Sequence, residues 1–166
     1  QILVDTLLGW MVEPFKKRQS RGIIVKTPKF YLFDVGVAGA VTKRRIPEMR
    51  GESFGRAFEH FIFMEIAAHS SYSELNYDIN YWRTKSGIEV DFILGGGEAA
   101  IEVKGQRRVD NRDLRPLSAF IDEYSPKRAL VVCNESEERV VGKIKILPWQ
   151  RFLEELWEGG IISAHS

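Results

Sequence analysis

The chain has 166 residues, a formal net charge of +1, 44% hydrophobic and 28% charged residues, which is the composition of one soluble globular domain with at most a small appendage. No apolar run is long enough to span a membrane and no signal peptide is visible, so we expect a cytoplasmic protein without a membrane partner. The single cysteine, Cys133, excludes an internal disulfide.

Positive charge is concentrated toward the N-terminus. Residues 1–50 contain ten Lys or Arg against four Asp or Glu, whereas residues 51–166 contain fourteen against nineteen. This asymmetry predicts a basic N-terminal appendage at 1–50 on an acidic main domain at 51–166. The chain starts at Gln1 inside an apolar run, which indicates a piece of a longer protein.

The appendage has the element order of the last helix and wing of a winged helix. Apolar spacing predicts a helix over 2–11, and Pro14 prevents it from continuing. The following elements are a basic loop, two short strands, a turn, a short helix and a linker at 16–22, 23–25, 29–33, 34–36, 37–42 and 43–45. We expect the basic wing to contact nucleic-acid phosphates through Lys16, Lys17, Arg18 and Arg21. A solvated loop that keeps the domain soluble is the alternative interpretation.

The main domain predicts an α/β fold. Apolar residues at three- and four-residue spacing predict helices over 52–69, 110–124 and 149–157. Alternating or continuous apolar runs predict strands over 77–84, 89–94, 99–104, 127–134 and 141–147. The predicted order after residue 51 is therefore α-β-β-β-α-β-β-α.

The second and third of these strands form a hairpin with an informative register. A two-residue turn at Gly96 and Gly97 places Asp91 opposite Glu102, with their Cβ atoms roughly 5 Å apart. In a regular strand, Glu89 and Asp91 share one face, and the apolar side chains of 88, 90, 92 and 94 share the other. Two carboxylates placed in this way repel unless one is protonated or a cation lies between them.

This element order, with Glu59 on the first helix, Asp91 on the second strand and Glu102-Val103-Lys104 on the third, resembles the PD-(D/E)xK nuclease superfamily. The phrases KTPKFYLFDVGVAG, GRAFEHFIF, YWRTKSGIEVDFIL and AIEVKG more narrowly resemble the DUF4143 domain, which is usually found C-terminal to an AAA+ ATPase module. The resemblance covers nearly the whole chain. It implies a restriction-endonuclease-like mixed central sheet flanked by helices, and a covalently linked N-terminal ATPase domain. This chain has no phosphate-binding Gly-x-x-x-x-Gly-Lys-Ser/Thr loop of its own.

The same residues suit metal-assisted cleavage of a phosphodiester. Asp91, Glu102 and the carbonyl of Val103 offer the hard oxygen ligands that Mg²⁺ or Mn²⁺ prefers. Lys104 lies on the same face as Glu102 and could orient the attacking water or stabilise transition-state charge. The resemblance adds Glu59 from the first helix. Arg107 and Arg108 follow directly and could reach a backbone phosphate, or form an exposed turn.

Two functions of different classes therefore stay open. The first is a Mg²⁺-dependent nuclease-like domain that acts on or binds DNA or RNA, with Glu59, Asp91, Glu102 and Lys104 as its catalytic residues. The second is a catalytically silent module of an ATPase that binds nucleic acid or protein. Taken one at a time, the charged residues are typical of solvated strand and helix faces. A homo-oligomer is compatible with the sequence, and a purely structural dimerisation domain ranks last.

Overall fold

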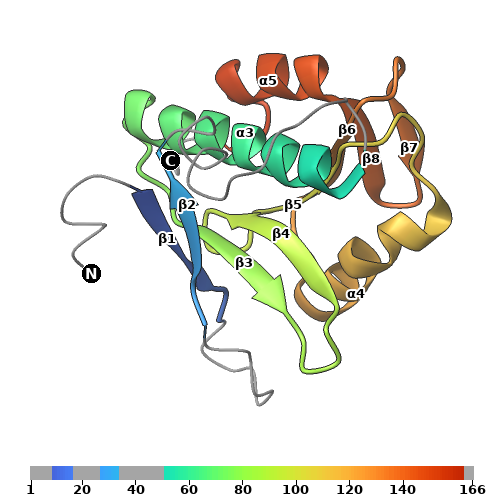
Figure 1. Ribbon diagram of the computed structural model, residues 1–166, viewed down its shortest axis with the longest axis horizontal. Coiled ribbons are helices and arrows are strands. Elements are labelled where there is room, and N and C mark those ends of the chain that lie inside the picture. Colours follow the sequence, from blue (N-terminus) through green and yellow to red (C-terminus); the bar gives the residue numbers. More distant parts are fainter. Residues whose placement is uncertain (1–8, 17–26, 34–50, 163–166) are drawn as a thin grey trace.

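The computed structural model describes residues 9–16, 27–33 and 51–162. These residues form one mixed sheet with helices on both faces (Figure 1). The strands are β1 (Gly9–Pro14), β2 (Lys29–Leu32), β3 (Ile79–Arg83), β4 (Glu89–Leu94), β5 (Ala99–Lys104), β6 (Arg128–Cys133), β7 (Arg139–Val141) and β8 (Ile144–Pro148). The α-helices are α3 (Gly51–Tyr72), α4 (Arg115–Tyr124) and α5 (Trp149–Trp157), and a 3-10 turn at Asn111–Leu114 leads into α4.

The eight strands lie in the order β2-β1-β3-β4-β5-β6-β8-β7. Strands β3, β4 and β5 form an antiparallel meander, and β6 and β8 continue the sheet parallel to β5. On the other side, β1 pairs parallel with β3 and antiparallel with β2, so β2 is an edge strand. The described N-terminal strands therefore extend the same sheet as the main domain.

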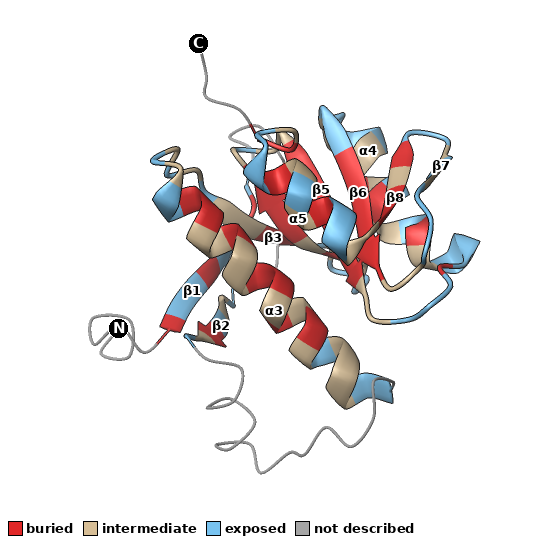
Figure 2. Ribbon diagram, turned by 90° about the horizontal axis from the view of Figure 1, so that it is seen from above, coloured by how far each residue is buried: buried red, intermediate tan, exposed pale blue. Residues whose placement is uncertain are grey.

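Each face of the sheet has its own apolar core. Helices α3 and α5 cover one face through side chains such as Phe58, Ile62 and Phe152, whereas α4 covers the other through Leu117 and Phe120. The central strands β5, β6 and β8 are almost entirely buried (Figure 2). Burial on both faces explains the continuous apolar run of β6, since a strand with one solvated face would alternate.

The α/β class and the three helices expected after residue 51 are confirmed. Two predictions were wrong. The helix expected over 2–11 was wrong at residues 9–11, which belong to strand β1 because residues 9–14 pair with β2 and β3, whereas 2–8 lie outside the described residues. The single strand expected at 141–147 is a β7–β8 hairpin that turns at Gly142, whose φ of +60° suits glycine.

Parts of the winged-helix prediction lie outside the described residues. These are Lys17, Arg18 and Arg21 of the basic wing, the strand at 23–25 and the elements at 34–45. The division into domains at residue 50 stays a prediction. Among the helices that the structure describes, none combines the length and the hydropathy needed to cross a membrane.

The predicted hairpin register is confirmed. Phe92 pairs with Ile101 and Leu94 with Ala99, as the predicted register requires, and the ladder ends at Phe92 and Ile101. The connection is longer than the expected two residues, because 95–98 form the turn. Gly95, Gly96 and Gly97 all have positive φ there, which costs glycine little.

Candidate active site

A β-bulge in β4 decides where the site lies. Asn80 of β3 pairs with Ile93, but Trp82 pairs with Val90, so two residues of β4 face the single residue Tyr81. The extra residue reverses the alternation of side chains at this point. Val90 accordingly belongs to the core under α4, whereas Phe92 belongs to the core under α3. The prediction that both share one face was therefore wrong.

The bulge turns Asp91 toward the α3 side of the sheet. Its Oδ2 accepts a hydrogen bond from the backbone N–H of Val103 at 2.9 Å. The backbone pairing of β4 with β5 ends at Phe92 and Ile101, so the Asp91 side chain satisfies a strand N–H beyond the last ladder pair. The carbonyl of Val103 points toward the same neighbouring strand, because both polar groups of a strand residue face one side.

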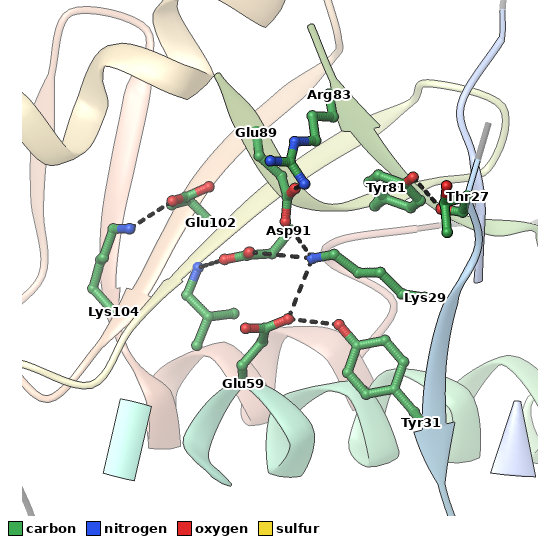
Figure 3. A network of polar contacts seen from close by, with 11 residues as sticks. Thr27, Lys29, Tyr31, Glu59, Tyr81, Arg83, Glu89, Asp91, Glu102 and Lys104 are labelled. Carbon is green, nitrogen blue, oxygen red and sulfur yellow. Dashed lines mark hydrogen bonds and ion pairs between the residues drawn. The ribbon is translucent and has the colours of Figure 1, made fainter. Parts of the chain in front are cut away.

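The ammonium of Lys29, a residue of β2, lies among three carboxylates, one of which is Asp91. Its Nζ lies 2.5 Å from Glu89, 3.5 Å from Glu59 of α3 and 3.9 Å from Asp91. Tyr31, also on β2, donates a hydrogen bond to Glu59 Oε1 at 2.5 Å. Figure 3 shows Glu59 of α3 and Glu89 and Asp91 of β4 pointing toward Lys29.

Glu102 and Lys104 form the other half of the site. Lys104 Nζ lies 2.7 Å from Glu102 Oε1, and Figure 3 shows this pair beside Asp91 but apart from Lys29. Only 3% of Glu102 is exposed, and its Oε2 has no hydrogen-bond partner among the described residues. A buried carboxylate oxygen without a donor is costly, so this atom invites a cation or water that the protein alone does not supply.

Burial raises the pKa values of both central carboxyls. Burial, followed by the charges of Glu102 and Glu59, holds the pKa of Asp91 well above its usual range, although Lys29 and the Val103 N–H oppose the rise. Burial raises the pKa of Glu102 to about 7 against the opposing charge of Lys104. Both groups would thus ionise more readily beside an additional cation.

A pocket with a volume of about 860 Å³ opens over these residues. It is lined by the first turns of α3, by Glu59 and Asp91, and by the end of β5 from Val103 to Arg107. The helix approaches the strand closely at Gly105, where an added Cβ would lie 3.1 Å from the Phe54 ring and 3.3 Å from the Gly55 Cα. Glycine at 105 therefore lets α3 bring Glu59 to the sheet.

The residues predicted to contact phosphates lie in different parts of the chain, and the structure describes only some of them. Arg107 and Arg108 are exposed, and Arg107 lines both the main pocket and a second one, of about 600 Å³, that also includes Arg108 and Arg139. Lys16 is exposed after β1, whereas Lys17, Arg18 and Arg21 lie outside the described residues. Of the predicted phosphate contacts, Arg107 thus lies at the main pocket and Arg108 at the second one.

The donor atoms fit a hard divalent ion in their chemistry. Mg²⁺ takes oxygen ligands of the kind offered here by the carboxylates of Asp91 and Glu102, including the unpartnered Oε2, and by the Val103 carbonyl. Among the residues that the structure describes, no three His, Cys, Asp or Glu side chains are grouped closely enough to hold a metal ion. The Lys29 ammonium instead lies among Glu59, Glu89 and Asp91.

Three residues of the cluster did not stand out in the sequence. Lys29 lies in the basic N-terminal segment that we expected to face phosphates, yet its ammonium faces carboxylates. Tyr31 and Glu89 enter the cluster at the same place. The alternation of β2 carried a signal, because Lys29 and Tyr31 are two residues apart and share a face. Without the pairing of β1 with β3, nothing indicated that this face meets Glu59.

One comparison with known proteins identifies a family. No curated protein and no solved structure matches the chain. The family model of DUF4143, described as a domain of unknown function, matches residues 54–152. The match starts within α3 and ends within α5, so it includes Glu59, Asp91, Glu102 and Lys104 but leaves out Lys29. Since the family model matches more than half of the chain, the chain belongs to the DUF4143 family.

Proposed function

We propose that this chain carries a divalent-metal-dependent phosphodiesterase site of the PD-(D/E)xK type that acts on a nucleic-acid backbone. The observation that carries the proposal is the buried Glu102 and the half-buried Asp91 on neighbouring strands, with Asp91 and Lys104 lining an open pocket. Bringing two acids together where water is largely excluded destabilises the protein unless a cation accompanies them, so a structural role alone does not account for the arrangement.

The topology supports the finer assignment to a restriction-endonuclease-like fold. The unit α3-β3-β4-β5-α4-β6 is a helix, an antiparallel meander, a helix on the opposite face and a strand parallel to β5. This is the order that the family resemblance implies. The same resemblance implies an ATPase module linked ahead of this domain, which we include in the proposal.

Each residue has a distinct part in the proposed chemistry. Asp91, Glu102 and the Val103 carbonyl would hold Mg²⁺ or Mn²⁺, which when bound supplies Lewis-acid activation of the phosphate and of water. Lys104 would orient the attacking water and stabilise negative charge that develops on the phosphoryl oxygens. Glu59 lines the same pocket and would complete the acidic site from α3. Arg107, at the pocket edge, would hold a neighbouring phosphate.

The test is cleavage of end-labelled single-stranded DNA, duplex DNA and RNA in Mn²⁺, with the Lys104→Ala and Glu102→Gln variants beside the parent chain. We expect cleavage that both substitutions abolish while the far-UV circular dichroism spectrum stays unchanged. A Lys127→Ala variant, which changes an exposed lysine paired with Glu98 far from the pocket, is the control. Cleavage that persists at full rate in both site variants would reject the assignment.

A second candidate is a catalytically silent binding module. The position of Lys29 favours it, because its ammonium already supplies a cation among Glu59, Glu89 and Asp91, where the metal would otherwise supply one. Such a module would bind nucleic acid through Arg107 and Arg108 without cutting it. Salt-dependent binding in EDTA, with no cleavage of any substrate in Mn²⁺, is its expected signature.

A further inference from the structure

The ammonium of Lys29 is the cation that lies within the carboxylate cluster of Glu59, Glu89 and Asp91. Its ammonium contacts three carboxylates from two elements, α3 and β4, at 2.5–3.9 Å. Burial lowers the pKa of Lys29, but Glu59, Asp91 and Glu89 outweigh burial and raise it, so the side chain stays charged. The cluster thus holds a permanent positive charge that comes from outside the region matched by the family model.

The strand that carries Lys29 is fastened to α3 by polar contacts. Tyr31 donates to Glu59 Oε1 at 2.5 Å, and the next residue of α3, His60, places its Nε2 2.6 Å from the carbonyl of Leu32. Strand β2 has four residues and lies at the sheet edge beside β1. An edge strand of this length can leave without unpairing the central sheet.

One atom connects Lys29 directly with metal binding. Asp91 has two carboxylate oxygens, and Oδ2 is engaged by the Val103 N–H. Oδ1 is the oxygen that faces Lys29. A metal that takes Asp91 through Oδ1, the oxygen that the Val103 N–H leaves free, meets an ammonium that lies 3.9 Å away. Two cations at that oxygen repel each other strongly in a buried site.

We infer that Lys29 is the resident cation of this site and that a divalent ion binds there only when the Lys29 ammonium withdraws, so that the seating of β2 controls metal occupancy. The inference rests on the proposed function. By linkage, whatever loosens β2 favours the metal, and the metal loosens β2 to the same degree. The N-terminal part of the chain becomes a regulator of the site.

The test measures Mn²⁺ binding rather than activity. Free Mn²⁺ is followed by electron paramagnetic resonance during titration of the parent chain and of Lys29→Met, Lys29→Gln, Lys29→Arg and Lys127→Met. Removing the charge at 29 should tighten the Mn²⁺ Kd about tenfold or more, within the usual range of coupling between two sites. Lys29→Arg, which keeps the charge, and Lys127→Met, which removes another carboxylate-paired lysine, should bind like the parent.

A second readout does not need a variant. Hydrogen exchange of the backbone in residues 27–33 should quicken when Mn²⁺ is added to the parent chain, while exchange in β6 stays the same. The same measurement on Asp91→Asn, which lacks the metal ligand, should show no response to Mn²⁺.

The outcomes separate this inference from the proposed function. Mn²⁺ binding that Asp91→Asn abolishes, with an unchanged or weaker affinity in both neutral Lys29 variants, would overturn the inference and leave the metal site standing. Millimolar Mn²⁺ that binds neither the parent nor Lys29→Met and Lys29→Gln would overturn both. Binding that appears only in the neutral variants would support both, since the charge at 29 would then be what keeps the metal out.

Discussion

Asp91 accepts a hydrogen bond from the backbone N–H of Val103 at 2.9 Å, and this contact joins the two halves of the site. It ties the bulged strand β4 to β5 at the point where their ladder has ended. The same carboxylate faces Lys29 on its other oxygen. Asp91 therefore has a structural role as the hydrogen-bond acceptor of the Val103 N–H, and an electrostatic role through its negative charge.

Two substitutions at position 91 should separate these roles. Asp91→Ala leaves the Val103 N–H without an acceptor, which should lower the free energy of unfolding by about 1–3 kcal/mol. Asp91→Asn keeps an oxygen for that N–H and removes a buried charge whose pKa is raised by burial, Glu102 and Glu59, so it should fold at least as stably as the parent at pH 8. Both changes should abolish Mn²⁺ binding.

Urea denaturation in EDTA measures the difference between the two variants. Equal losses of stability in Asp91→Ala and Asp91→Asn would contradict this division, because they would mean that the negative charge itself stabilises the fold. Glu123→Ala, at an exposed position on α4, serves as a surface control that should change the free energy of unfolding by no more than about 0.5 kcal/mol.

The pH dependence of stability should bear the signature of Glu102. Burial raises its pKa in the folded protein from 4.5 to about 7, so between those pH values the folded state binds more protons than the unfolded state. Stability should therefore fall as pH rises from about 4.5 to about 7, by on the order of 3 kcal/mol. The raised pKa of Asp91 acts in the same direction.

The measurement compares the free energy of unfolding of the parent with that of Glu102→Gln across pH 4–8 in EDTA. The variant cannot ionise at 102, so its stability relative to the parent should rise through this interval. A difference that stays flat would show that Glu102 ionises at an ordinary pH and that its burial is compensated elsewhere.

Much of the fold could be predicted from the sequence because its signals are local. The α3 stripe, the alternation of β5 and the continuous apolar run of β6 each follow from side-chain periodicity within one element. The β4–β5 register followed as well, since a slip of one residue would expose Ile101. The pairs Phe92–Ile101 and Leu94–Ala99 were therefore predicted correctly.

The bulge and the Lys29 contact could not be predicted, because both depend on partners distant in sequence. The bulge exists only relative to β3, where Tyr81 faces two residues of β4. Lys29 reaches Asp91 only because β1 joins the sheet beside β3. The pattern of 88–94 in isolation favours a regular strand, and that assumption put Phe92 on the wrong face.

Close packing at Gly105 predicts a stability difference between two glycines. An added Cβ at 105 would lie within 3.1 Å of the Phe54 ring, so Gly105→Ala should destabilise the protein by about 1–3 kcal/mol as α3 shifts away from β5. Gly55→Ala is the matched control. Its Cβ meets nothing within 4 Å, so it should stabilise α3 by up to about 1 kcal/mol.

Thermal unfolding followed by circular dichroism distinguishes the two glycine variants, which should move the melting temperature in opposite directions. The displacement of α3 in Gly105→Ala also carries Glu59 away from Lys29, so the same variant should bind Mn²⁺ differently from the parent. A melting temperature that rises in both variants would mean that α3 and β5 are further apart than the structure shows.

Arg107 and Arg108 should account for part of the salt dependence of nucleic-acid binding. Both are exposed at the edge of the pocket, and removing one cation that neutralises a phosphate should reduce the slope of log K against log salt by about 0.7–0.9. We therefore expect Arg107→Ala and Arg108→Ala to weaken binding to all sequences alike and to flatten this slope.

Fluorescence anisotropy with labelled single-stranded and duplex DNA across 50–300 mM salt provides the measurement. Arg151→Ala removes an equally positive residue from α5, where it pairs with Glu154, and should leave the slope unchanged. If Arg151→Ala flattens the slope as much as the other two, the pocket edge is not the binding surface and net charge alone drives the interaction.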